Sequence, residues 1–285
     1  MFESYWSGVE AFHIRARKQK QNNTPNPISK QHEPTNNPKT NYSKIAKYYD
    51  KVRVVPADAL LSRIAEYGKI CSDSFVLDVG CGTGRFPLKM FHLRNFVCCA
   101  LEPSREMLKE AITKDKSKHI MWIQGDGQNL PFQDNVFDCV YMTMVIHHIE
   151  NKELALREIY RTLKKSRNCV IMTISHGHIK RHILHDFPGV TTIDLKRVPS
   201  IPSLKEKIAN AGFRDVRHHL IRYEEGEMPT SEYLERVKAK YISTLTLLSE
   251  ESSQRGFKIF QQRIQNKYGA CIKRMFEFVF AVGRK

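Results

Sequence analysis

Hydrophobic and polar positions recur with two different periods along this chain. Residues 42–49 and 57–67 carry apolar side chains at helical spacing. Short apolar runs rich in Val, Ile, Phe and Cys then alternate with helix-like segments, and these runs are Phe75–Val79, Phe96–Leu101, Met121–Gln124, Phe137–Met142 and Cys169–Ile174. Such runs are typical of strands that are buried on both faces. The alternation predicts βαβ units, and hence a parallel sheet with helices on both sides.

The C-terminal third departs from this alternation. Two further strands are expected at His218–Tyr223 and Phe276–Arg284, after a helix over Ser203–Ala211 that Gly212 ends. Between the two strands, the spacing of five apolar residues predicts a helix of about five turns, and these residues are Tyr233, Val237, Tyr241, Leu245 and Leu248. Residues 179–202 and 224–268 are expected to be insertions on the substrate side of the domain.

The N-terminal segment differs in composition from the rest. Residues 21–41 consist mainly of Asn, Pro, Thr and Lys, with one large apolar side chain. Such a stretch buries too little surface to offset the entropy lost on ordering. We therefore expect residues 1–41 to be a disordered or loosely docked tail, and residues 42–285 to be the folded domain.

Composition narrows the class of protein. The chain has 285 residues and is 41% hydrophobic, and it has no continuous apolar run that could span a bilayer or serve as a secretory signal. A cytoplasmic protein without a membrane span is expected. The seven cysteines form no CxxC pair, and His176, His178, His182 and His185 match no familiar zinc spacing. No metal site is expected.

The charge balance leaves two types of partner open. Lys and Arg number 46 against 30 Asp and Glu, which gives a formal net charge of +16. A charge of this size supports non-specific affinity for nucleic acid, and RNA is one candidate partner. Solvated basic faces explain the charge equally well.

A glycine-rich turn follows the first expected strand, in the sequence VLDVGCGTGR (residues 76–85). Glycines at 80, 82 and 84 let the backbone turn sharply and approach a ligand. Their GxGxG spacing differs from the GxGxxG pattern of pyrophosphate sites, and Asp78 in the strand is badly placed for a pyrophosphate. The second strand ends in Glu102, an acid that can accept both hydroxyls of a ribose. The pattern favours a nucleoside ligand.

Five segments in order give the chain a family resemblance, and they are VLDVGCGTGR (76–85), ALEPS (100–104), GDGQNLPF (125–132), FDCVYMTMVIHHI (137–149) and LKKSRNCVIM (163–172). With them, roughly residues 44–285 resemble the class I S-adenosylmethionine-dependent methyltransferases of the methyltransferase type 11 group. The resemblance implies a Rossmann-like α/β fold. Its sheet has seven mostly parallel strands with helices on both faces and an antiparallel last strand, and a helical insertion lies near the C-terminus.

The resemblance also implies a cofactor site for S-adenosylmethionine, with S-adenosylhomocysteine as the product. The glycine turn surrounds the methionine portion, Glu102 holds the ribose, and Asp126 and Gly127 meet the adenine. Tyr49 and Arg53 lie on a helix that closes over the cofactor, and Met142, Thr143 or His147 line the methyl side. The complete expected set is Tyr49, Arg53, Asp78, Gly80, Cys81, Gly82, Gly84, Glu102, Pro103, Asp126, Gly127, Met142, Thr143 and His147.

The residues leave the methyl acceptor open. Methyl transfer requires alignment, exclusion of water and, for some acceptors, removal of a proton. His147 and His148, after the fourth expected strand, are candidate catalytic bases, and so are His176 and His178 after the fifth, although packing explains such pairs as well. A small organic acceptor is the first expectation. The alternatives are tRNA or another RNA, as for the similar wobble-uridine tRNA methyltransferases, and a non-catalytic module that binds the cofactor.

Overall fold

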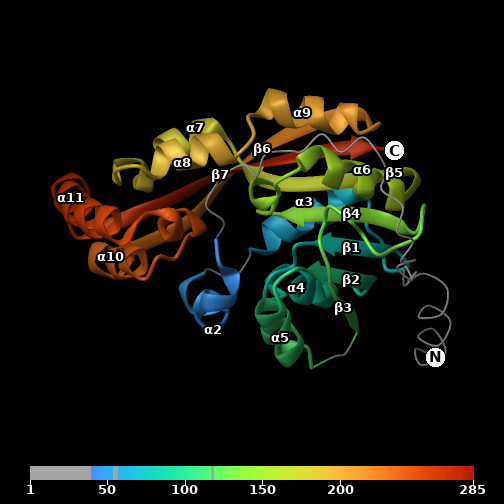
Figure 1. Ribbon diagram of the computed structural model, residues 1–285, viewed down its shortest axis with the longest axis horizontal. Coiled ribbons are helices and arrows are strands. Elements are labelled where there is room, and N and C mark those ends of the chain that lie inside the picture. Colours follow the sequence, from blue (N-terminus) through green and yellow to red (C-terminus); the bar gives the residue numbers. More distant parts are fainter. Residues whose placement is uncertain (1–39, 54–56, 117–118) are drawn as a thin grey trace, which may run out of the picture.

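The computed structural model describes residues 40–53, 57–116 and 119–285, and a seven-stranded sheet forms their centre (Figure 1). Its strands are β1 (Phe75–Val79), β2 (Val97–Glu102), β3 (Ile120–Gln124), β4 (Phe137–Thr143), β5 (Leu163–Ile174), β6 (Arg214–Pro229) and β7 (Cys271–Arg284). They lie in the order β3-β2-β1-β4-β5-β7-β6. The first five are parallel, whereas β7 is antiparallel to both of its neighbours. The predicted fold class is confirmed.

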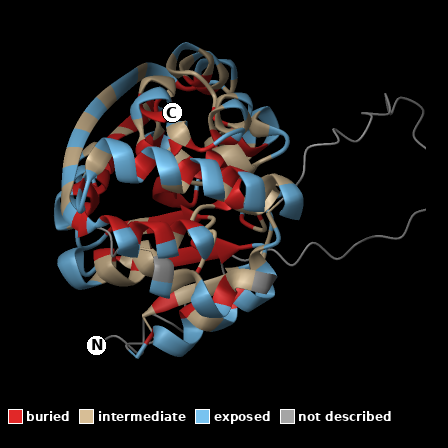
Figure 2. Cartoon of the chain, turned by 90° about the vertical axis from the view of Figure 1, so that its left-hand side faces the viewer, coloured by how far each residue is buried: buried red, intermediate tan, exposed pale blue. Residues whose placement is uncertain are grey.

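Successive residues of the parallel strands face two different hydrophobic cores. Val76 packs in the core formed with α3 (Asp58–Gly68), α4 (Arg85–Arg94) and α5 (Arg105–Lys114). Its neighbour Leu77 packs in the core formed with α6 (Lys152–Thr162) and α9 (Ile201–Asn210). Figure 2 shows the buried strands between helices whose outer surfaces are exposed. Burial on both faces explains why these strands are continuously apolar.

The last two strands of the sheet, β6 and β7, extend well beyond the ends of the other five (Figure 1). β7 pairs with β5 only from Phe278 onward, so its first residues project past the edge together with β6. At the far end of this pair lie α10 (Thr230–Lys238), η3 (Ser243–Leu247) and α11 (Glu250–Tyr268). Phe260 and Ile264 of α11 belong to a third core that is separate from the two cores of the sheet. We call residues 230–268 the helical lobe.

One helix prediction was wrong. A single helix through Tyr233 and Leu248 was expected, but α10 ends at Lys238 and the chain turns at Lys240, which has a φ of +53°. The apolar spacing nevertheless marked core residues, because Tyr233 and Leu245 are buried in the same third core. The spacing therefore predicted correctly which residues are buried, but it predicted one continuous helix where the structure has two separate elements.

The segment before α9 packs against the helical lobe. It consists of α7 (His176–Arg181), η2 (Ile183–Asp186) and α8 (Val190–Arg197). Leu184 and Val190 join the third core, and Asp194 accepts a hydrogen bond from Thr244 in η3. The two segments that were expected to be insertions therefore form one packed unit.

Helix α2 (Tyr42–Val52) begins at the expected start of the folded domain. The tail predicted for residues 1–41 lies, up to residue 39, outside the described residues. In the part of the chain that the structure describes, no helix is long and apolar enough to cross a membrane. Five of the seven cysteines are buried, and Cys71 and Cys271 are exposed.

Candidate functional site

The glycine-rich turn between β1 and α4 forms one wall of the site. Gly80, Gly82 and Gly84 have φ angles of 82°, 57° and 77°, a region that favours glycine. A Cβ added at Gly80 would lie 2.6 Å from Val145, and one at Gly84 would lie 2.6 Å from Trp122. At Gly82, an added Cβ would meet no atom within 4 Å. The backbone at Gly82 is therefore open to close approach by a ligand.

The acid at the end of β2 lies directly beside this turn. The carboxylate of Glu102 accepts hydrogen bonds from the backbone N–H groups of Gly82, at 2.9 Å, and of Ser104, at 3.0 Å. Burial raises the pKa of Glu102, and the two backbone hydrogen bonds offset part of that effect. The buried carboxylate of Glu102 and the open backbone at Gly82 are thus adjacent.

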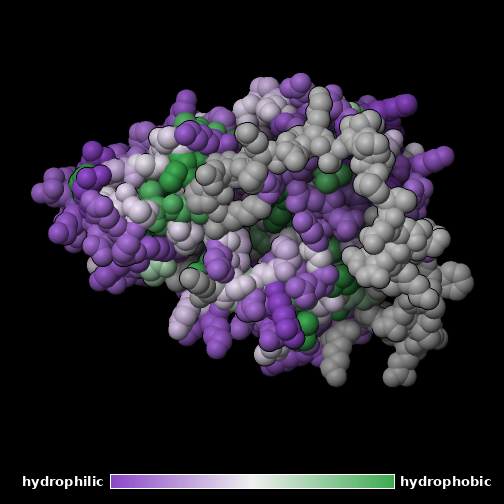
Figure 3. Space-filling view, viewed as in Figure 1, coloured by the Kyte–Doolittle hydropathy of each residue, from purple (hydrophilic) through white to green (hydrophobic). Residues whose placement is uncertain are grey.

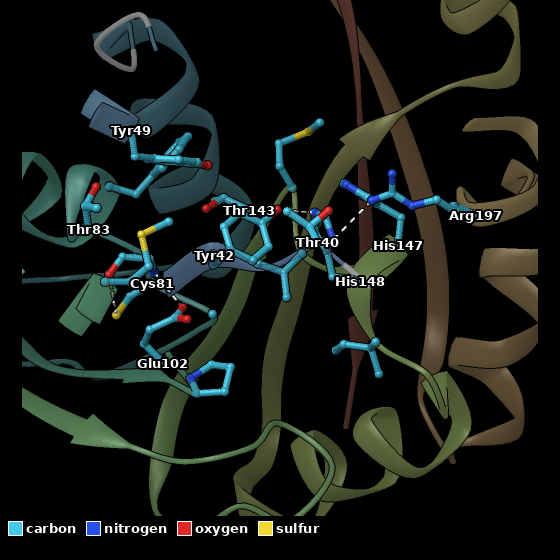
Figure 4. Close-up of a pocket in the computed structure, with 18 of the residues that line it drawn as sticks. Thr40, Tyr42, Tyr49, Cys81, Thr83, Glu102, Thr143, His147, His148 and Arg197 are labelled. Atoms are coloured by element: carbon cyan, nitrogen blue, oxygen red, sulfur yellow. Dashed lines mark hydrogen bonds between the residues drawn. The ribbon is translucent and has the colours of Figure 1, made fainter. Parts of the chain in front are cut away.

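A cavity of about 630 Å³ opens at the carboxyl ends of β1, β2 and β4, where parallel sheets commonly bind ligands. Its volume is in the range of small-molecule sites. Helices α2 and α8 and the turn η1 (Ile146–His148) complete its walls. Ten predicted site residues line it, namely Tyr49, Arg53, Gly80, Cys81, Gly82, Glu102, Pro103, Thr143, His147 and His148. Figure 4 shows Glu102 and Cys81 at one end and Arg197 at the other, with Tyr42 between them.

Three predicted residues lie behind the cavity wall. Gly84 caps the N-terminus of α4, and Met142 is completely buried in the core. Asp78 is also completely buried, and neither of its carboxylate oxygens has a hydrogen-bond partner among the described residues. Burial raises the pKa of Asp78 to about 8, and the nearby Tyr141 hydroxyl offsets only part of that effect. The Asp78 carboxyl therefore underlies the glycine turn without lining the cavity.

Two further predicted residues follow β3, and neither lines the cavity. Asp126 is exposed, and its carboxylate accepts hydrogen bonds from the backbone and side chain of Gln128. Gly127 is buried, and a Cβ there would lie 2.9 Å from Val79. The structure brings the glycine turn, Glu102 and the two histidines of η1 together at the cavity. Asp126 and Gly127 lie outside its lining.

The two histidines of η1 have different surroundings. Nδ1 of His148 accepts a hydrogen bond from Arg197 at 3.1 Å, because a guanidinium group can only donate. The proton of the neutral ring is therefore on Nε2, which donates to the Tyr42 hydroxyl at 2.7 Å. Burial, aided by the charge of Arg197, lowers the pKa of His148 to about 3. His148 is neutral, and both of its nitrogens are occupied.

His147 has no such partners. Its buried Nδ1 makes no hydrogen bond with any described residue, and the ring lines the cavity. Burial lowers the pKa of His147 well below its usual range, so that this ring too is neutral. Of the two candidate bases in η1, His147 has a ring available for a ligand.

A polar network that sequence reasoning missed closes the cavity. Arg197 of α8 donates to both His148 and Ser243, the latter at 3.2 Å, and His148 contacts Tyr42 of α2. We call Tyr42, His148, Arg197 and Ser243 the latch. Its members are far apart in the sequence, and no local pattern marks Arg197 or Ser243. Tyr42 was within the predicted first helix but was not singled out.

The opposite end of α2 is held by Asp50. Its carboxylate accepts a hydrogen bond from the Thr83 hydroxyl, at 2.5 Å, and pairs with Lys114 of α5. Thr83 belongs to the glycine turn itself. Helix α2 is thus fixed over the cavity at both ends.

The histidines beyond β5 each serve a local structural contact. His176 lies 2.8 Å from the Val198 carbonyl oxygen, and Nδ1 of His178 accepts the backbone N–H of Glu277. His182 caps the turn η2. Among the described residues, no group of three or more His, Cys, Asp or Glu side chains is arranged to hold a metal ion.

Comparison with known proteins identifies the domain. A sequence model of the family described as "Methyltransferase domain" matches residues 77–171. The malonyl-[acyl-carrier protein] O-methyltransferase of Buchnera aphidicola is 33% identical over 141 residues, which are 48% of this chain and 54% of that protein. The UbiE ubiquinone/menaquinone biosynthesis C-methyltransferase of Haemophilus ducreyi is 25% identical over 173 residues, 50% of this chain and 66% of that protein.

Comparison of structures supports the same conclusion about the fold. A protein from an antibiotic biosynthesis pathway of Anabaena variabilis has a TM-score of 0.63 and 20% sequence identity, with 79% of this chain and 97% of that chain covered. The chain spans 54% and 66% of the two curated relatives named above. The matched residues contain the glycine turn, Glu102 and the histidines of η1. Residues 77–171 therefore match the methyltransferase domain family, within a fold like that of the Anabaena protein.

Proposed function

We propose that this protein transfers a methyl group from S-adenosylmethionine to a small organic acceptor and releases S-adenosylhomocysteine. One observation carries the proposal. The Cβ-free wall at Gly82 and the buried carboxylate of Glu102 share a cavity of about 630 Å³, within the residues that match the methyltransferase family. The two curated relatives are named for methyl transfer to oxygen and to carbon, which supports the reaction class.

The residues of the cavity fit this cofactor in kind. Glu102 would accept the ribose hydroxyls in charge-assisted hydrogen bonds, and the backbone at Gly80–Gly82 would face the methionine portion. Tyr49 of α2 and Arg53, just after this helix, would cover it, with the guanidinium of Arg53 toward the methionine carboxylate. Asp126 and Gly127 remain the proposed adenine contacts. When bound, the cofactor supplies a methyl group that is already activated by its sulfonium charge.

The protein itself would align the cofactor with the acceptor, exclude water from the cavity and accept a proton. The latch and Asp50 would hold α2 over the cavity and exclude water. His147 is neutral and its Nδ1 makes no hydrogen bond with a described residue, so it is the residue we propose to accept a proton from the acceptor. His148 would serve as a positioning residue, because both of its ring nitrogens are engaged.

A two-part experiment tests the proposal. Calorimetry of the full chain with S-adenosylmethionine should show one site. Glu102→Gln should weaken that binding by roughly 1–3 kcal/mol through the loss of charge-assisted hydrogen bonds, whereas Glu110→Gln, outside the cavity, should not change it. Tritiated methyl should then appear in a small-molecule fraction of the source cell.

The outcomes separate the alternatives. Label in an RNA fraction instead would replace the small acceptor with RNA. Binding without any transfer would favour a non-catalytic module. No binding by the wild-type chain would contradict the proposal as a whole.

A further inference from the structure

A second cavity, of about 400 Å³, lies between the sheet and the helical lobe. Its walls come from the ends of β5, β6 and β7, from α7 and α8, and from α10. It adjoins the first cavity, because Arg53, Arg85, Phe86 and Met144 line both. On the face shown in Figure 3, hydrophobic atoms gather between α7–α8 and α10. A molecule in the second cavity would therefore be next to one in the first.

The walls of the second cavity are largely apolar and aromatic. Phe276 and Phe278 stack with their ring centroids 5.7 Å apart and an interplanar angle of 7°. Across the cavity, the hydroxyls of Tyr233 and Tyr241 hydrogen-bond to each other at 3.0 Å, so that the polar atoms of both rings are satisfied. Flat rings with satisfied polar atoms favour an apolar or aromatic occupant.

The charges of this cavity are unbalanced. Six basic side chains line it, against the acidic side chains of Asp194 and Glu225. Four of the basic groups pair with a carboxylate, in the pairs Arg181–Glu277, Arg236–Glu232, Lys273–Glu224 and Arg274–Glu225. The remaining two, Arg53 and Arg85, form no ion pair with any described residue. They are also the two basic residues that line both cavities.

Two guanidinium groups that form no ion pair with a described residue lie at this junction, so each can pair with an anionic group of a bound molecule. Burial lowers the pKa of Arg85, and the nearby acids Asp50 and Glu225 offset part of that effect. The proposed cofactor brings a single carboxylate. The guanidinium of Arg53 lies over the ring of Tyr49, 5.0 Å from its centroid, and Tyr49 lines only the first cavity. Arg53 is therefore assigned to the cofactor, which leaves Arg85 for a second anion.

We infer that the second cavity binds the methyl acceptor, and that this acceptor is an apolar molecule with one anionic group, which pairs with Arg85. This inference rests on the proposed function, because it places the acceptor next to the cofactor's methyl group. It narrows the acceptor class from small organic molecules in general to hydrophobic acids. The aromatic walls hold the apolar body, and the guanidinium fixes its orientation relative to the first cavity.

A matched pair of fluorescent probes tests this assignment. 1-Anilinonaphthalene-8-sulfonate carries a sulfonate, and N-phenyl-1-naphthylamine is the same molecule without it. Both are titrated into the full chain in the presence of S-adenosylhomocysteine. We expect Arg85→Gln to weaken the sulfonate probe about tenfold, the scale of one charge-assisted pair, and to leave the neutral probe and S-adenosylhomocysteine unchanged.

Two further variants serve as controls. Lys273→Gln removes the same charge from the same cavity, but its partner is Glu224, so we expect a change below about twofold. Ile174→Trp fills the cavity from the end of β5 and should displace both probes while S-adenosylhomocysteine still binds. Retained cofactor binding shows that each variant is folded.

Specific outcomes would overturn the inference. If Arg85→Gln weakened S-adenosylhomocysteine and spared the sulfonate probe, Arg85 would belong to the cofactor site. If Arg85→Gln and Lys273→Gln had equal effects, general charge would explain the binding. Failure of the proposed function is recognised separately, because the wild-type chain would then fail to bind S-adenosylmethionine or to transfer label.

Discussion

At the scale of single residues, the glycines of the turn between β1 and α4 differ in how much space surrounds them. Gly82 faces open space, whereas Gly84 is packed against Trp122. We expect Gly82→Val to lower the affinity for S-adenosylmethionine at least about a hundredfold, because the new side chain occupies the ligand's position. Its effect on folding should be limited to about 1–2 kcal/mol from the left-handed backbone conformation. Calorimetry and urea denaturation measure the two effects.

Gly84→Val is the matched control for this prediction. Its Cβ would lie 2.6 Å from the ring of Trp122, so the main loss should be in stability. Equal stability losses in the two variants, or normal affinity in Gly82→Val, would contradict the assignment of the open wall to a ligand.

Asp78 gives a second prediction at this scale, in pH dependence. Its pKa is raised from 3.8 to about 8 in the folded protein, so the protonated form is the one that folding favours. The stability contributed by that proton is fully present below about pH 4 and is lost as the pH rises toward 8. Asp78→Asn mimics the neutral acid and should raise the free energy of unfolding at pH 8 by more than about 1 kcal/mol, with little change at pH 4.

Asp138→Asn provides the comparison for Asp78→Asn. Asp138 is also nearly buried, but its carboxylate accepts the backbone N–H of Phe75 and pairs with Lys164 and Arg167. Its amide variant should lower stability at pH 8. Urea denaturation of both variants at pH 4 and pH 8 measures these changes in the free energy of unfolding. If Asp78→Asn were less stable than the wild-type protein at pH 8, the raised pKa of Asp78 would be contradicted.

At the scale of elements, the strands were predictable because burial on both faces makes each of them a continuous apolar run in the sequence. Val76 and Leu77 face opposite cores, so both must be apolar, and a short apolar run before a glycine turn identifies β1. The break after α10 had no comparable signal. Tyr233 and Leu245 share a core, and their spacing fitted one helix although Lys240 reverses the chain between them.

Helix α2 provides a prediction of its own. Tyr42→Phe removes the hydroxyl that receives the His148 proton and so loosens one end of the helix. We expect cofactor release to accelerate by up to about tenfold, which corresponds to one net hydrogen bond of roughly 0.5–1.5 kcal/mol. Stopped-flow fluorescence measures the release. Tyr48→Phe, on the exposed side of the same helix, should leave the rate unchanged, and equal rates in all three proteins would exclude a latch role.

At the scale of the whole molecule, the residues of the proposed cofactor site are marked by sequence motifs, whereas those of the proposed acceptor site are not. Gly82 and Glu102 lie in adjacent segments that a sequence motif connects. Arg197 reaches His148 and Ser243 only through the fold, because these two contacts span 49 and 46 residues of sequence. That Arg85 forms no ion pair with a described residue likewise depends on which carboxylates the fold brings near. Long-range packing of this kind has no local pattern.

The separate third core predicts that the helical lobe can loosen independently. Phe260 is completely buried there, against Phe187 and Tyr233, so Phe260→Ala should destabilise the lobe by about 3–5 kcal/mol. Hydrogen exchange should accelerate in α10 and α11 but not in β1 and β4. The lobe contributes Tyr233, Arg236, Tyr241, Ile242 and Tyr268 to the second cavity but only Leu247 to the first, so binding of 1-anilinonaphthalene-8-sulfonate in the presence of S-adenosylhomocysteine should fall while cofactor affinity stays within about twofold. Phe137→Ala, in the core of the sheet, should instead accelerate exchange throughout. Uniform acceleration in Phe260→Ala would show that the two parts unfold as one unit.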